Sequence, residues 1–121
     1  SIGENNIKEI PEHIGSLVNL EKLYLSYNEI TDIKGLKNLV NLKELILYKN
    51  TITEIPEHIG SLVNLTKLDL SYNKITEIKG IDSLVNLNKL VLYNNEITEI
   101  ILKKFVIWLI LKIVMDFVDE I

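Results

Sequence analysis

The sequence predicts an α/β solenoid. In this fold a short parallel sheet lines the concave face of an arc, 3-10 or short helical segments form the convex face, and a hydrophobic helix caps the C-terminal end. Three observations predict it: a unit of 22 or 23 residues that repeats along the chain, an alternation of leucine and polar residues within each unit, and an apolar tail outside the repeat. Periods of this length are typical of stacked repeat architectures.

Each unit is marked by an asparagine that is followed two residues later by isoleucine. The asparagines are Asn5, Asn28, Asn50, Asn73 and Asn95, at spacings of 23, 22, 23 and 22. Residues 6–50 aligned with residues 51–95 give 32 identities in 45 positions, which indicates duplication of a two-unit block. Because so small a unit cannot bury its own leucines, neighbouring units must stack.

A short strand is predicted in each unit. Leu23 and Leu25 alternate with Lys22, Tyr24 and Ser26, which is the period of a strand with one buried face. The same pattern recurs at residues 45–47, 68–70 and 90–92. Stacking would place these segments side by side as parallel strands about 4.8 Å apart.

The segments that return from one strand to the next are predicted on the convex face. Pro11 and Pro56 can begin helical turns there, because the first turn of a helix leaves the missing N–H unused anyway. Four glycines, at positions 15, 35, 60 and 80, supply backbone freedom for the turns. His13 and His58 would lie about 10 Å apart, two strand spacings, which is too far to share a metal ion. No metal site is therefore expected.

The composition argues against several classes of function. A net charge of −4 gives no basic excess for nucleic acid, and the absence of cysteine removes disulfides and cysteine-based zinc sites. Alanine, arginine and glutamine are also absent, beside 20 Ile, 20 Leu, 13 Asn and 13 Lys. This bias is what a gene from an AT-rich genome would encode.

The tail, residues 101–121, has 15 apolar and 6 charged residues without glycine or proline. As a helix it would be about 31 Å long, with apolar side chains on all sides. One side could cap the solenoid, and the other would need a second copy, a partner or a membrane surface. Residues predicted for self-association are Phe105, Ile107, Trp108 and Leu111. Asp116, Asp119 and Glu120 argue against membrane attachment.

The consensus L-x-x-L-x-L-x-x-N-x-I resembles the leucine-rich repeat family. It is seen at Leu20, Leu23, Leu25, Asn28 and Ile30, and the resemblance covers residues 1–100. The shorter unit is similar to internalin repeats, and the longer unit, with Ile-Pro, to those of bacterial and plant members. The resemblance implies a solenoid over residues 1–100, with a partial first repeat and four strand-bearing units. It also implies a non-enzymatic protein- or peptide-binding module. Together with the AT-rich bias, it suggests a secreted effector or surface protein of an AT-rich bacterium.

Catalysis and cofactors are not expected. The paired carboxylates, such as Glu9 and Glu12, recur on a predicted outer face instead of in an enclosed cleft, and no phosphate loop or nucleophile elbow occurs.

Binding is instead predicted on the exposed face of the sheet, which carries every tyrosine in the chain, because tyrosine offers amphipathic area at little entropic cost. The candidate residues are Lys22, Tyr24, Tyr27, Glu44, Ile46, Tyr48, Lys67, Asp69, Tyr72, Lys89, Val91 and Tyr93. Two further exposed positions, Ser26 and Ser71, are expected beside them. The alternative is a structural repeat protein that self-assembles as a homodimer through its tail.

Overall fold

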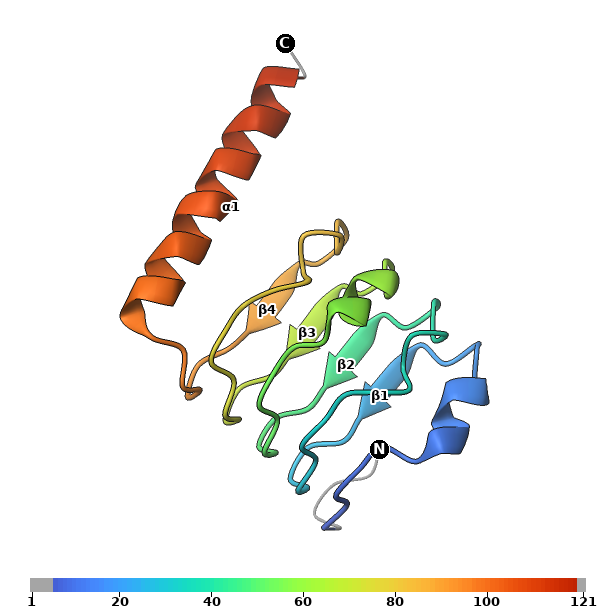
Figure 1. Cartoon of the computed structure of the whole chain (residues 1–121). Helices are drawn as coiled ribbons and strands as arrows, with labels where there is room; N and C mark the ends of the chain where they lie inside the picture. The colour runs from blue at the N-terminus through green and yellow to red at the C-terminus, as the bar shows by residue number, and fades with distance from the viewer. Residues whose placement is uncertain (1–5, 120–121) are drawn as a thin grey trace.

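The computed structural model describes residues 6–119. Residues 1–5, part of the predicted partial first repeat, and residues 120–121, part of the predicted cap, lie outside the described residues. Four parallel strands form one sheet in sequence order: β1 (Lys22–Tyr24), β2 (Glu44–Ile46), β3 (Lys67–Asp69) and β4 (Lys89–Val91). Figure 1 shows these strands side by side, with every return segment on the other side of the arc. The predicted solenoid is confirmed.

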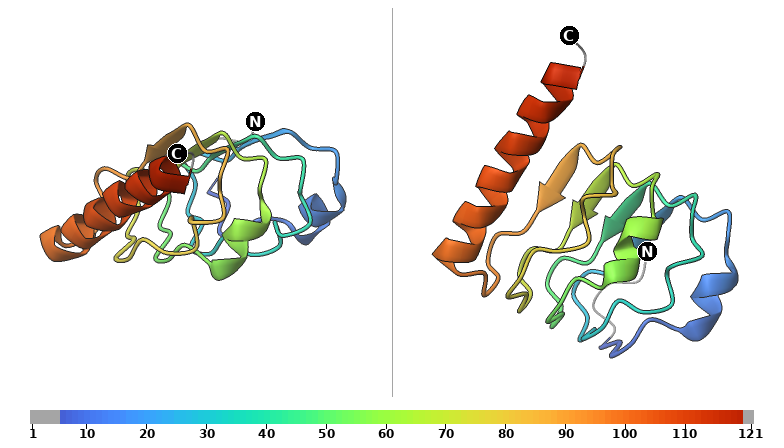
Figure 2. Two further views of the ribbon diagram at one scale, coloured as in Figure 1. Left: turned by 90° about the horizontal axis from the view of Figure 1, so that it is seen from above. Right: turned by 45° about the horizontal axis from the view of Figure 1, so that its top comes forward.

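The return segments differ between the two kinds of unit. In the longer units they contain 3-10 helices, η1 (Glu12–Ser16) and η2 (Glu57–Ser61), each preceded by the predicted proline. In the shorter units, residues 32–42 and 77–87, the return consists of bends and turns. Figure 2 shows the resulting arc from two further directions.

The core lies between the sheet and the return segments. The inward leucines of the strands, such as Leu45 and Leu68, meet isoleucines of the returns, such as Ile33 and Ile55, and all four are fully buried. Each fully buried side chain of this size contributes roughly 1.5–3 kcal/mol relative to exposure. The core therefore runs along the whole stack instead of belonging to one repeat.

The asparagine ladder joins each repeat to the one before it. The amide of Asn50 donates to the carbonyls of Leu25 and Leu47 at 3.0 Å, and its Oδ1 accepts from the N–H of Ile30 at 3.1 Å. Asn73 repeats these bonds one repeat later, and both side chains are buried. The amides thus satisfy backbone groups that the turn would otherwise leave unpaired.

The glycines serve two purposes, not the one predicted. Gly35 and Gly80 have φ of +83° and +75°, a region that glycine enters without steric cost. Gly15 and Gly60 lie in the 3-10 helices without positive φ, but a Cβ at Gly15 would lie 2.9 Å from the carbonyl oxygen of Gly35. The second pair therefore permits close packing of successive returns.

The tail is one helix, α1 (Glu99–Asp119), which begins two residues before the predicted start. Thr98 precedes it and accepts the N–H of Ile101 on its hydroxyl at 3.3 Å, as helix-capping residues do. Figure 1 shows α1 beyond β4, projecting past the end of the arc. Most of its apolar side chains are exposed, so α1 covers the end of the solenoid incompletely.

Replacement of Asn50 by alanine should lower the free energy of unfolding by at least about 2 kcal/mol, because it leaves the buried Ile30 N–H without its acceptor. Urea denaturation monitored by circular dichroism measures the change. Asn41→Ala is the matched control, since Asn41 makes one exposed bond, to the Val18 carbonyl at 2.9 Å, and should cost less than about 1 kcal/mol. Equal losses in the two variants would contradict the assigned role of the ladder.

Candidate functional site

The exposed face of the sheet presents the predicted residues in two straight columns. The register aligns Lys22, Glu44, Lys67 and Lys89 in one column and Tyr24, Ile46, Asp69 and Val91 in the next. The alternating leucines point to the core between them. The strand pairing therefore brings side chains more than 60 residues apart in sequence onto one surface.

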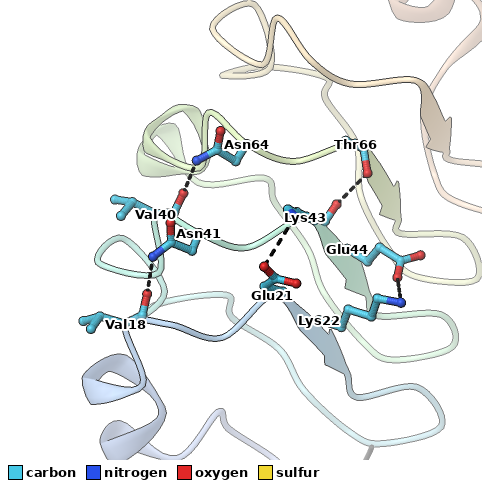
Figure 3. Close-up of polar contacts among 9 residues, drawn as sticks. All are labelled: Val18, Glu21, Lys22, Val40, Asn41, Lys43, Glu44, Asn64 and Thr66. Carbon is cyan, nitrogen blue, oxygen red and sulfur yellow. Dashed lines mark hydrogen bonds and ion pairs between the residues drawn. The ribbon is translucent and has the colours of Figure 1, made fainter.

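Glu44 is the centre of a polar cluster on β1 and β2. Its carboxylate accepts a hydrogen bond from the Tyr24 hydroxyl at 2.8 Å and lies 3.2 Å from Lys22 Nζ; Figure 3 shows the ion pair. The Tyr24 hydrogen bond, followed by that from Lys22, holds the pKa of Glu44 below its usual value. The same contacts raise the pKa of Lys22 and of Tyr24.

A second carboxylate, that of Asp69 on β3, accepts hydrogen bonds from a residue close in sequence. Its Oδ1 accepts the hydroxyl of Ser71 at 2.6 Å and the Ser71 N–H at 3.0 Å. Ser71 is completely buried, which corrects the prediction that it lies exposed beside the tyrosines. An aspartate side chain that accepts the backbone N–H two residues later forms an Asx turn.

The β3 and β4 side of this face carries two neighbouring lysines beside Asp69. Lys67 and Lys89 stand opposite each other on neighbouring strands, and within residues 6–119 neither forms an ion pair. Like charges directly opposite in a sheet are destabilising. An anionic group bound between these lysines would relieve that repulsion.

Four of the five tyrosines form a continuous ladder past the ends of the strands. Ring centroids are separated by 5.3 Å for Tyr27 and Tyr48, 5.1 Å for Tyr48 and Tyr72, and 5.5 Å for Tyr72 and Tyr93, each pair edge to face. A hydrogen bond with Tyr27, together with burial, raises the pKa of Tyr48. Edge-to-face pairs contribute roughly 0.5–1.5 kcal/mol each beyond their buried area.

The ladder combines tyrosines from two different sequence positions. Tyr27 and Tyr72 directly precede the ladder asparagine, whereas Tyr48 and Tyr93 stand one residue earlier. Tyr27 and Tyr72 have φ of 59° and 56°, in the left-handed region that bulky residues seldom adopt. The ring of Tyr72 lies between those of Tyr48 and Tyr93, and the ring of Tyr27 lies beside that of Tyr48 at the end of the ladder.

In the other two units, the residue directly before the ladder asparagine is a lysine or an asparagine, with the same left-handed backbone conformation. Lys49 has φ of 59°, and its Nζ lies 5.4 Å from the centroid of the Tyr27 ring. A cation at this distance is attracted by the ring face. The ladder therefore carries a positive charge at the end nearest β1.

A second row of asparagines, not predicted from the sequence, joins the return segments. Asn41, Asn64 and Asn86 donate to the carbonyls of Val18, Val40 and Val63 in the preceding repeats at 2.9, 2.7 and 3.0 Å. Figure 3 shows the first two of these bonds, and the donation from Thr66 Oγ1 to the Lys43 carbonyl. The recurrent Val-Asn-Leu triplet was the available signal. Its valines are exposed beside the row and form an apolar ridge away from the tyrosines.

The four residues predicted for self-association do not share one face of α1. Phe105 and Trp108 line a cavity of 390 Å³ between α1 and the last return segment, beside Ile78 and Ile81. Ile107 and Leu111 are 58% and 59% exposed and point away from that cavity. An outward seam therefore has to be built from Ile107, Leu111 and residues farther along α1.

Other classes of site find no support in the part of the chain that the structure describes. Between residues 6 and 119 no group of three His, Asp or Glu side chains is arranged to hold a metal ion. His58 instead lies 3.0 Å from the carbonyl oxygen of Ile33. Among the described residues, no helix combines the length and apolar character required to cross a bilayer.

Comparison with known proteins agrees with the repeat pattern. The family profile described as leucine rich repeats (2 copies) matches residues 1–38, 18–60, 40–83 and 63–104. No curated protein matches the sequence.

Three solved structures illustrate the likeness. A leucine-rich repeat protein of Leptospira interrogans is 40% identical over 81% of this chain, with a TM-score of 0.78. The plant peptide hormone receptor RGFR1, in complex with RGF2, is 32% identical over 71% of the chain, with a TM-score of 0.65. An internalin of Listeria monocytogenes is 25% identical over 79%, with a TM-score of 0.62. The chain spans 26%, 15% and 34% of the lengths of these proteins.

Replacement of Tyr24 by phenylalanine should raise the pKa of Glu44, because it removes the hydrogen bond that most favours the carboxylate. With its folded pKa lowered, Glu44 contributes stability that is present above its usual pKa of 4.5 and lost as the pH falls through the folded value. The variant should therefore lose less stability on acidification. Carboxyl-detected NMR titration measures the pKa, with Tyr93→Phe as the control that leaves it unchanged.

Proposed function

Because this chain belongs to the leucine-rich repeat family, we propose that it is a protein- or peptide-binding module whose ligand lies across the exposed face of the sheet. Proteins of this family commonly mediate protein binding. The tyrosine ladder is the observation that carries the proposal, since four aromatic rings in contact form a rigid amphipathic surface. Four strands about 4.8 Å apart limit the footprint to a peptide or to one edge of a protein.

The charges of this face favour an acidic ligand. The two columns of this face hold three lysines and two carboxylates, a net charge of +1: Lys22, Lys67, Lys89, Glu44 and Asp69. Within residues 6–119, Lys22 alone among these lysines has a carboxylate at ion-pair distance. The chain as a whole carries −4, so this positive face is a local departure from the overall charge. Acidic groups over β3 and β4 would set the orientation of a ligand whose apolar groups contact the tyrosines.

The solenoid would thus act by recognition without catalysis. Tyr27, Tyr48, Tyr72 and Tyr93 would anchor the ligand, and Ile46 and Val91 would add apolar area beside them. Secretion and an effector role remain predictions from the sequence.

Double replacement of Tyr48 and Tyr72 by alanine should weaken binding of peptides selected against the native chain from a displayed random library by at least about tenfold. Each truncation removes an anchor whose loss typically costs more than 1 kcal/mol. Isothermal titration calorimetry measures the affinities. Val40→Ala with Val63→Ala is the matched control, because it removes two exposed side chains from the apolar ridge instead. Undiminished binding by the tyrosine variant would exclude the ladder as the site.

A second candidate function is self-assembly through α1. Ile107, Leu111, Val114 and Val118 are spaced four, three and four residues apart, so they share one face of the helix, and all are at least half exposed. Phe105 lies on the other side of α1, against the last return segment. Pairing two copies along this seam would remove the apolar side chains from water.

If this second function holds, the native chain should sediment as a dimer at micromolar concentration. Ile107→Lys combined with Val114→Lys should then yield monomers, because each buried charge would lack a partner. Asp116→Lys is the control, since residue 116 lies on the opposite face of α1 and its replacement should leave the dimer intact. A native chain that sediments as a monomer at high concentration would exclude self-assembly.

A further inference from the structure

Each repeat donates three backbone N–H groups to the repeat that follows it. In the repeat of β3, Leu70 donates to the carbonyl of Val91 at 2.9 Å and Tyr72 to that of Tyr93 at 3.0 Å. Ile75 donates to the side-chain oxygen of Asn95 at 2.9 Å. The repeats of β1 and β2 form the same three bonds with the repeats that follow them. The acceptors for these three N–H groups are therefore supplied by the following repeat.

The repeat of β4 has the corresponding donors, and within residues 6–119 it is followed by α1 instead of by a further strand. The corresponding groups are the N–H groups of Leu92, Asn94 and Ile97, and within residues 6–119 none of them has an acceptor at hydrogen-bond distance. α1 follows in the chain but cannot supply carbonyls along β4, because the carbonyls of a helix are engaged within it. The edge of β4 thus presents a row of unpaired donors.

The apolar side of this edge is also incomplete. In the repeat of β3 the counterparts of three apolar side chains are fully buried, whereas the three here are partly exposed: Leu90, Leu92 and Ile97. Between the last repeat and α1 lies a cleft of 430 Å³, whose apolar lining includes Leu87, Leu90, Leu92, Leu102, Val106 and Leu109. A further repeat would fill this space with its own leucines.

α1 makes few contacts with the repeats across the cleft. No Cα atom of α1 lies within 8 Å of a Cα atom of β4, whereas neighbouring strands are in direct contact. The helix is fastened by an exposed hydrogen bond from Lys112 Nζ to the carbonyl of Asp82 at 2.9 Å and by the half-buried Phe105. A rotation of α1 about Thr98, the residue before the helix, would expose the edge without disturbing β4.

We propose that the free edge of β4 binds one further parallel strand from a partner polypeptide, with α1 as a displaceable cover. The partner segment carries the pattern acidic-Leu-x-Leu-x-x-Asn-x-Ile. Its carbonyls accept from Leu92 and Asn94, its asparagine accepts from Ile97, and its leucines enter the cleft. Its acidic residue stands opposite Lys89, as Glu44 stands opposite Lys22 in the first pair of strands. This is strand addition to a sheet edge, with side chains that select the register.

The chain itself contains a segment with this pattern, residues 43–52, with the sequence KELILYKNTI. A fluorescein-labelled synthetic peptide of this sequence is the probe, and anisotropy with the full chain measures its binding. Trp108 is the only tryptophan and lines the cleft, so its emission reports displacement of α1 in the same titration with unlabelled peptide. We expect saturable binding accompanied by a change in Trp108 emission.

Two matched changes test the register. A peptide with aspartate at both inward leucines, Leu45→Asp and Leu47→Asp, should bind at least tenfold more weakly. The chain variant Lys89→Glu, an exposed position, should also bind the native peptide more weakly and should regain affinity for a peptide with Glu44→Lys. Restored affinity in this charge exchange could not arise from non-specific hydrophobic adsorption.

The proposal is overturned if the native peptide fails to bind, or if it and the aspartate-bearing peptide bind equally. It is also overturned if Lys89→Glu leaves the affinity for the native peptide unchanged, or if binding leaves Trp108 emission unaltered. The chain variant with Tyr48→Ala and Tyr72→Ala should retain peptide binding at the edge. That result separates this site from the sheet-face function proposed above.

Discussion

The stacking of the four strand-bearing repeats depends on one constraint: a single repeat cannot satisfy its own backbone. The turn after each strand buries carbonyl and N–H groups, and these find partners through the ladder asparagine of the same and the next repeat. The amide suits this task because it donates and accepts at once. Stacking fixes the register of the strands, and the register in turn aligns the columns of the exposed face.

This constraint is the reason why so much of the fold could be predicted from the sequence. Spacing alone identifies Asn28, Asn50 and Asn73 as equivalent, and equivalence places Lys22, Glu44 and Lys67 in one column without any knowledge of contacts. Burial of the leucines follows from their alternation with polar residues. A property that recurs at the same position in each repeat can therefore be predicted from the repeat spacing.

Features that depend on local backbone conformation could not be predicted in this way. Tyr27 and Tyr48 occupy different positions in their units, so sequence alignment separates them, yet Tyr27, with φ of 59°, has its ring centroid 5.3 Å from that of Tyr48. The burial of Ser71 depends on Asp69, which the equivalent positions of the other units lack. α1 is apolar on all sides, and only its direction of departure from Thr98 determines that Phe105 faces the repeats while Ile107 faces water.

The two-repeat period of the tyrosine ladder has a geometric consequence for what can lie along it. Because rings at equivalent positions recur in every second unit, Tyr27 and Tyr72 are two strand spacings apart, about 9.6 Å. A polyproline II helix advances about 9.3 Å in one turn of three residues. An extended chain in that conformation would therefore meet equivalent tyrosines at every third residue. Lengthening the protein by a whole 45-residue block would continue this match, whereas adding a single unit would break it.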